Sequence, residues 1–185
     1  MKLSQRTLLL GALGLFLAAV PSTAQIERLD LTKMVTKTDE AVIGKITGRE
    51  VFRIDHPIDG PELYYTTLFV EGESLYTGSK KTHAVTFPGG FINDEEGVFN
   101  SEAPSADEIA IGNKVVVFSL WSDNMGGDVA ANALYASHGG IYQVFEARNR
   151  ETIVQGRGDG YAIERNVKAG QLKTQIQNIR QALGR

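Results

Sequence analysis

The chain has 185 residues, of which 42% are apolar and 22% charged, and it contains no cysteine. This composition is typical of an ordinary folded protein and excludes disordered and collagen-like chains. The lack of cysteine excludes disulfides, thiolate metal sites and thiol nucleophiles, so the hydrophobic core must supply the stability.

The N-terminal segment has the pattern of a secretory signal peptide. Lys2 and Arg6 precede an uninterrupted apolar run over 8–20, and small residues end the segment. The pattern predicts a signal peptide over 1–24 that is cleaved before Gln25. Because the apolar run is shorter than the roughly 20 residues of a membrane-spanning helix, we expect a secreted or periplasmic product with no membrane span.

The charge balance of the predicted mature chain argues against a nucleic-acid partner. Without the signal peptide, 17 basic side chains face 22 acidic ones, which gives a net charge of −5. Recognition of a phosphate backbone requires a basic stripe. The one pair of adjacent basic residues, Lys80 and Lys81, falls in a predicted turn, so we expect no nucleic acid to bind.

The first part of the mature chain predicts a short helix and then a long strand. Apolar residues recur at helical spacing over 30–37 and at every second position over 41–54. On this strand the predicted inner face carries Val42, Gly44, Ile46, Gly48, Phe52 and Ile54, and the outer face carries Lys45, Thr47, Arg49 and Arg53. Two glycines on the inner face are typical of the first strand of a small barrel, where the sheet bends tightly.

The middle of the chain predicts three more strands separated by turns rich in glycine and proline, over 63–70, 82–87 and 114–121. Gly72 and Glu73 indicate a bulge after the first of these. The last strand is apolar on both faces, which favours a central position in the sheet. The segment 91–110 is expected to be a long surface excursion with a short strand near Phe91.

The C-terminal part predicts two hairpins and a helix. One hairpin pairs 133–137 with 141–146, and the other pairs 151–155 with 161–164. Apolar residues then recur at helical spacing over 172–183, which predicts an amphipathic helix that covers an apolar surface.

Four stretches resemble bacterial secreted domains of unknown function, and more distantly the netrin-like module of tissue inhibitors of metalloproteinases: 38–47, 65–71, 87–90 and 111–118. The resemblance implies a small Greek-key barrel of the OB type with an N-terminal and a C-terminal helix. The chain length and the lack of a linker predict one domain over 25–185. Those inhibitors place an N-terminal cysteine on the catalytic zinc. This chain has no cysteine, so that mechanism does not carry over.

Histidines are the first candidates for chemistry. His56, His83 and His138, with a carboxylate such as Asp55, would suffice for a metal-dependent hydrolase, but no spacing fixes any two of them together. Ser137 and His138 are neighbours in sequence, and adjacent residues of a strand point to opposite faces, so they are poorly placed as nucleophile and base. The sequence therefore assigns no catalytic, cofactor-binding or metal-ligating residue.

Three further motifs have structural explanations that we favour. The acidic loops 93–96 and 123–128 could hold calcium but do not match an EF-hand. The cell-adhesion tripeptide over 157–159 lies among glycines, where a turn explains it. A binding face could be lined by aromatic residues that we otherwise expect in the core or at the barrel rim: Tyr64, Tyr65, Tyr76, Trp121, Tyr135 and Tyr142.

These observations favour a secreted, non-catalytic binding or accessory module of the bacterial envelope, with a protein or polysaccharide partner and no cofactor. The alternatives are the metal-dependent hydrolase, and a protease inhibitor that acts without an N-terminal cysteine. A fold by itself does not decide among them.

Overall fold

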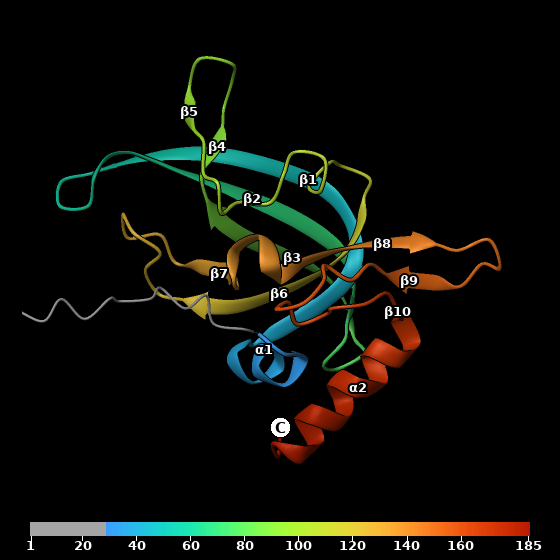
Figure 1. Ribbon diagram of the computed structural model, residues 1–185. Helices are drawn as coiled ribbons and strands as arrows, with labels where there is room; N and C mark the ends of the chain where they lie inside the picture. The colour runs from blue at the N-terminus through green and yellow to red at the C-terminus, as the bar shows by residue number, and fades with distance from the viewer. Residues whose placement is uncertain (1–28) are drawn as a thin grey trace, which may run out of the picture.

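The computed structural model describes residues 29–185, which are coloured in Figure 1. The predicted signal peptide over 1–24 and its cleavage site before Gln25 lie outside the described residues. In the described part, the elements follow in the order α1 (Leu31–Lys37), β1 (Glu40–His56), β2 (Gly60–Ser74), β3 (Lys80–Pro88), β4 (Gly90–Phe91), β5 (Gly97–Val98), β6 (Lys114–Ser122), β7 (Ala131–Leu134), the 3-10 helix η1 (Ser137–Gly140), β8 (Ile141–Glu146), β9 (Thr152–Val154), β10 (Val167–Lys168) and α2 (Ala169–Ala182).

Five strands close into a barrel in the order β1-β2-β3-β7-β6, and β6 returns to pair with β1. All neighbours are antiparallel except β3 and β7, which run parallel. Both α-helices lie on one side of this barrel, and the β4–β5 hairpin stands out on the other (Figure 1). The predicted fold class, a small β-barrel with flanking helices, is therefore confirmed.

A register shift in β1 lies between Ile46 and Gly48 and leaves Thr47 as an extra residue. An extra residue of this kind moves the following side chains to the opposite face of the sheet, because the side-chain period of a strand is two. The predicted inner face was therefore wrong beyond Ile46. The bulge expected at Gly72 and Glu73 was also misplaced, since β2 passes through them in continuous register with β1.

The shift redistributes the polar residues of β1. Arg49 lies opposite Leu68 of β2, whose side chain is completely buried in the barrel. Val51 lies opposite Thr66 on the same face, and Lys45, before the shift, lies opposite Glu71 on the outside. Arg49 and Lys45, which the sequence placed on one face, are thus on opposite faces.

Two apolar clusters lie on the two sides of the barrel wall. The cluster inside the barrel consists of Val42, Ile46, Leu68, Val70, Val85, Phe87, Ile109, Val115, Val117, Leu134 and Ile141. The outer cluster lies between the barrel and the helices, and it includes Met34, Val35, Leu75, Phe118, Tyr142, Leu172 and Ile176. Successive residues of β6 alternate between the two clusters, which explains why this strand has no polar face.

Both predicted hairpins in the C-terminal part were wrong. β7 and β8 do not pair with each other, because each pairs with a different half of β6 along the same edge. Between β7 and β8, Ala136 and Ser137 adopt left-handed backbone, with φ of 56° and 53°, and η1 begins at Ser137. The chain therefore does not fold back on β7 and instead continues along β6. β9 pairs with β8 and β10, whereas 161–164 forms no strand.

Among residues 29–185, neither helix is long and apolar enough to cross a membrane.

Candidate functional site at the open end of the barrel

The most distinctive surface is a hollow at the end of the barrel where β1 and β2 extend beyond their partners. We call it the mouth cavity. It has a volume of about 500 Å³, within the range of ligand sites, and its walls include Arg49, Val51, Phe87, Phe91, Phe99 and Ile109. Barrel mouths are common binding positions because side chains from several strands converge there.

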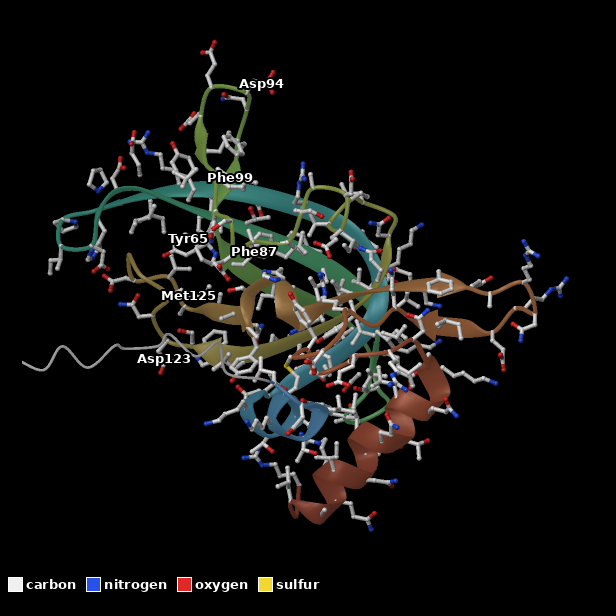
Figure 2. The ribbon with its side chains drawn as sticks, in the orientation of Figure 1. Tyr65, Phe87, Asp94, Phe99, Asp123 and Met125 are labelled. Carbon is white, nitrogen blue, oxygen red and sulfur yellow. The ribbon has the colours of Figure 1, made fainter. Side chains whose placement is uncertain are left out.

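Aromatic side chains of the β4–β5 hairpin form the outer wall of the mouth cavity. Phe91 is 51% exposed and Phe99 is 79% exposed, although both are large and apolar. Ile92 and Val98 of the same hairpin are 45% and 43% exposed, so this hairpin carries a contiguous apolar surface. Figure 2 shows Phe99 near the base of the hairpin and Asp94 near its tip. Exposed apolar patches of this kind mark interaction surfaces.

The base of the hairpin is held by contacts that only glycine permits. The Thr66 hydroxyl donates a hydrogen bond of 2.7 Å to the carbonyl of Gly89. A Cβ atom on Gly90, where φ is 131°, would lie 2.2 Å from that same hydroxyl oxygen. The Asn100 amide donates to the Pro88 carbonyl at 2.9 Å across the base. The hairpin is therefore fixed relative to β2.

Arg49 is the cation of the mouth cavity. Its side chain is exposed, and it makes no hydrogen bond or ion pair with any residue of the described part of the chain. Arg53, four residues further along the strand and on the same face, is instead engaged by Asp55, with Nε donating at 3.1 Å to Oδ1. A guanidinium that no described residue engages, beside an apolar hollow, is suited to a carboxylate on a ligand.

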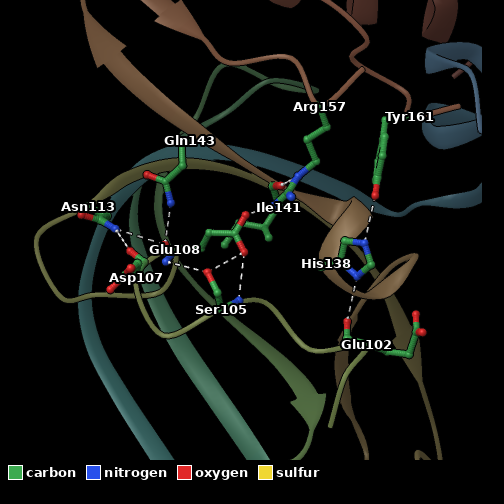
Figure 3. Close-up of polar contacts among 10 residues, drawn as sticks. All are labelled: Glu102, Ser105, Asp107, Glu108, Asn113, His138, Ile141, Gln143, Arg157 and Tyr161. Carbon is green, nitrogen blue, oxygen red and sulfur yellow. Dashed lines mark hydrogen bonds and ion pairs between the residues drawn. The ribbon is translucent and has the colours of Figure 1, made fainter. Parts of the chain in front are cut away.

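The opposite wall of the mouth cavity is anchored by the polar network drawn in Figure 3. Glu108 accepts hydrogen bonds from the backbone N–H and the hydroxyl of Ser105, at 2.9 and 3.0 Å, and forms an ion pair with Arg157. Burial raises the pKa of Glu108, but the Ser105 hydrogen bonds and the Arg157 charge outweigh it, so the pKa lies below its usual value. The network joins the 102–113 segment to the loop after β9.

This network also assigns a structural role to the cell-adhesion tripeptide. Besides its ion pair, Arg157 donates through Nε to the Ile141 carbonyl at 2.9 Å, and its guanidinium lies over the Tyr142 and Tyr161 rings. The guanidinium of Arg157 is therefore engaged within the protein, which supports the preferred explanation of this tripeptide as part of a turn.

The three histidines have separate partners. His56 lies 3.2 Å from Asp128 through Nε2, and His138 lies 3.0 Å from the Tyr161 hydroxyl, also through Nε2. Among residues 29–185, no group of three or more His, Cys, Asp or Glu side chains is placed to hold a metal ion. The geometry on which the metal-dependent hydrolase depended is thus not found in the described chain.

His83 forms a contact that the sequence did not suggest. Its Nε2 shares a hydrogen bond of 2.7 Å with the hydroxyl of Ser119, and both side chains are buried. Burial lowers the pKa of His83, and the nearby charge of Lys81 lowers it further. A serine beside a histidine resembles a nucleophile with its base, but this hydroxyl is sealed inside the barrel and only 1% of Ser119 is exposed.

The acidic loops use their polar groups locally. In 93–96, the Asn93 side chain accepts from the N–H groups of Glu95 and Glu96, both at 2.9 Å. In 123–128, Asp123 accepts from the Trp121 indole at 2.7 Å. These contacts order the two turns, and neither loop gathers its carboxylates at one point.

Most of the candidate aromatic residues are in the core. Tyr64, Tyr65, Tyr76 and Tyr142 are each less than 9% exposed, whereas Trp121 is 52% exposed. The exposed aromatic residues of the mouth cavity, Phe91 and Phe99, were missed because they lie in a segment that the sequence marked only as a surface excursion. The two phenylalanines within that polar segment were the available signal.

A scan against protein-family models, a search of curated proteins and a search of solved structures found no match to this chain. The comparisons therefore supply no relative from which a function could be transferred.

Proposed function

We propose that this protein is a non-catalytic binding module. The mouth cavity holds the end of a protein partner's chain, where an apolar side chain lies next to a carboxylate. The single observation that carries this proposal is the Arg49 side chain, which pairs with no residue among 29–185, beside a hollow with exposed phenylalanine walls. Secretion to the envelope or the medium is part of the proposal and rests on the signal-peptide pattern alone.

The chemistry of the cavity favours a partner with a bulky apolar side chain next to a negative charge. Phe87 and Ile109 join the cavity to the barrel core, so a buried apolar group would extend an existing cluster. Each square ångström of apolar surface removed from water contributes about 25 cal/mol. A carboxylate placed at Arg49 would add a charge-assisted hydrogen bond and orient the ligand.

The hydroxyls of the cavity favour binding over catalysis. Thr66 donates to a carbonyl, which cannot act as a base. Ser105 donates to the Glu108 carboxylate, but the pKa of Glu108 is lowered and its charge is paired with Arg157, so this carboxylate is a weak base. No histidine is among the described residues that line the cavity. The contact of Ser105 with this weak base therefore favours a structural role for the hydroxyl over acyl transfer.

The first test uses anilinonaphthalenesulfonate, a fluorescent probe that combines an apolar body with an anionic group. We expect the folded protein to bind one probe molecule, and Phe99→Ser and Arg49→Gln each to weaken binding at least about fivefold. Ile111→Ser is the matched control, since Ile111 is 65% exposed but lies outside the cavity. Equal weakening by the control would contradict the assignment of the site.

The second test separates the carboxylate from the apolar group. An acetylated dipeptide that ends in phenylalanine with a free carboxylate should displace the probe at least about fivefold better than the same peptide as an amide. In Arg49→Gln the two peptides should compete equally. If the acid and the amide compete equally with the wild-type protein, Arg49 does not bind a carboxylate and the proposed ligand class is wrong.

A further inference from the structure

A second surface lies on the outer face of the barrel, away from the mouth cavity. It is a groove of about 860 Å³ between the outer faces of β1 and β2, the start of β3 and the first turn of α2. It shares no lining residue with the mouth cavity. We call it the lysine groove because five of the eight lysines in residues 29–185 line it: Lys45, Lys80, Lys81, Lys114 and Lys173.

We propose that the lysine groove binds a linear anionic polysaccharide. Two of its lysines are neutralised within the protein, since Lys81 pairs with Glu40 and Lys173 pairs with Glu73. The side chains of the other three make no hydrogen bond or ion pair with any described residue. Against them the groove holds one further acid, Glu71. The groove is therefore positive in a chain whose net charge is −3.

The register shows that this concentration of charge opposes stability in the free protein. Lys45 lies directly opposite Lys114 across the β1–β6 pair. Like charges at directly opposed strand positions destabilise a sheet, and opposite charges stabilise it. Glu71 lies opposite Lys45 on the other edge of β1, but the two side chains form no ion pair. A bound polyanion would relieve the repulsion between the two lysines.

The floor of the groove is built from backbone. Gly44 and Gly72 face each other across β1 and β2, and a Cβ on Gly72 would lie 2.0 Å from the carbonyl oxygen of Ile43. The strands approach so closely that no side chain fits between them. The lysines stand on neighbouring elements around this floor, so their charges are spread along the groove and suit an extended ligand with repeated charges better than one phosphate.

The lining favours a polysaccharide over a single-stranded nucleic acid. No aromatic side chain is among the described residues that line the groove, so bases would find no stacking platform. Thr82 and Thr152 line it as well, and hydroxyls of this kind can bond to sugar hydroxyls. The chemistry fits a chain of uronic acids.

The test measures binding of alginate oligosaccharides to the full mature chain by isothermal titration calorimetry. We expect Lys45→Gln, Lys80→Gln and Lys114→Gln each to weaken binding at least about threefold. Lys37→Gln is the control, because it removes the same charge from α1, outside the groove. Raising the salt from about 50 to about 200 mM should weaken binding roughly tenfold, by release of counterions.

One variant must act in the opposite direction. Glu71→Gln removes the remaining acid of the groove and should strengthen alginate binding, a gain that a damaged fold would not produce. The proposal is overturned if neutral dextran binds as well as alginate, if Lys37→Gln weakens binding as much as Lys45→Gln, or if oligothymidylate of equal charge binds more tightly. Absence of alginate binding at low salt overturns it too.

Discussion

Replacement of Gly72 by alanine should open the barrel at its tightest point. The new Cβ would lie 2.0 Å from the Ile43 carbonyl oxygen and 2.4 Å from the Gly44 Cα, and both are backbone atoms. Ordinary contact begins at 3.4 Å, so β1 and β2 must separate by about 1.4 Å, the difference between 3.4 and 2.0 Å. Overpacking of this kind costs about 1–3 kcal/mol, and each stretched ladder hydrogen bond costs about 1 kcal/mol more.

Alanine also restricts the unfolded chain, which returns about 0.4–1 kcal/mol. The net expectation is a loss of roughly 2–4 kcal/mol in the free energy of unfolding, measured by urea denaturation. Two glycines serve as controls. Gly48→Ala would place its Cβ 3.2 Å from the Phe69 ring, a side chain that can move, and should cost under about 1 kcal/mol. Gly170→Ala meets nothing within 4 Å and lies in α2, so it should stabilise by up to about 1 kcal/mol.

The loss in the free energy of unfolding must be largest for Gly72→Ala, smaller for Gly48→Ala and smallest for Gly170→Ala. If Gly72→Ala destabilises no more than Gly48→Ala, the two strands do not approach as closely as the described register requires, and the backbone floor of the lysine groove is wrong as well.

Two further predictions concern the barrel interior. The pKa of His83 is lowered in the folded protein, so the unfolded chain binds a proton at this residue first as the pH drops, and the free energy of unfolding should fall below about pH 6.5. His83→Gln should flatten this dependence in urea titrations between about pH 7.5 and 5. An unchanged dependence would refute the assignment of the pH effect to His83. Val117→Asp should unfold the domain in circular dichroism, because an unpaired buried charge costs several kcal/mol, comparable with the whole stability of a domain. Ile111→Asp, at an exposed position, should stay folded.

Periodicity predicted the elements of this fold well wherever the chain follows one regular pattern. β6 was placed correctly because its apolar residues serve the interior and the outer cluster alternately. α2 was placed correctly because Leu172 and Ile176 pack on the outer cluster at helical spacing. Pairing was harder to predict. β7 and β8 look like a hairpin in sequence, but their partner is β6, and that choice depends on contacts far apart in the chain.

The candidate site was missed for a different physical reason. Arg49 belongs to a run of alternating polar residues, and nothing in its local sequence marks the extra residue at Thr47. The enclosure of the mouth cavity depends on a segment more than forty residues later, which carries Phe91 and Phe99. The same holds for the buried pair of His83 and Ser119, which periodicity does not bring together.

The bulge at Thr47 has a consequence for function, because it divides the cations of β1 between two surfaces. Lys45, before it, lines the lysine groove, and Arg49, after it, lines the mouth cavity on the opposite face of the sheet. Four residues of regular strand would have left both on one face. Lys45→Gln should therefore weaken alginate binding and leave the fluorescent probe bound as tightly as before, whereas Arg49→Gln should do the reverse. Both side chains are exposed and each variant removes one positive charge, so the two proteins are matched in charge and each controls for the fold of the other. If either variant weakens both ligands equally, one positively charged surface binds both, and the division of β1 into two sites is wrong.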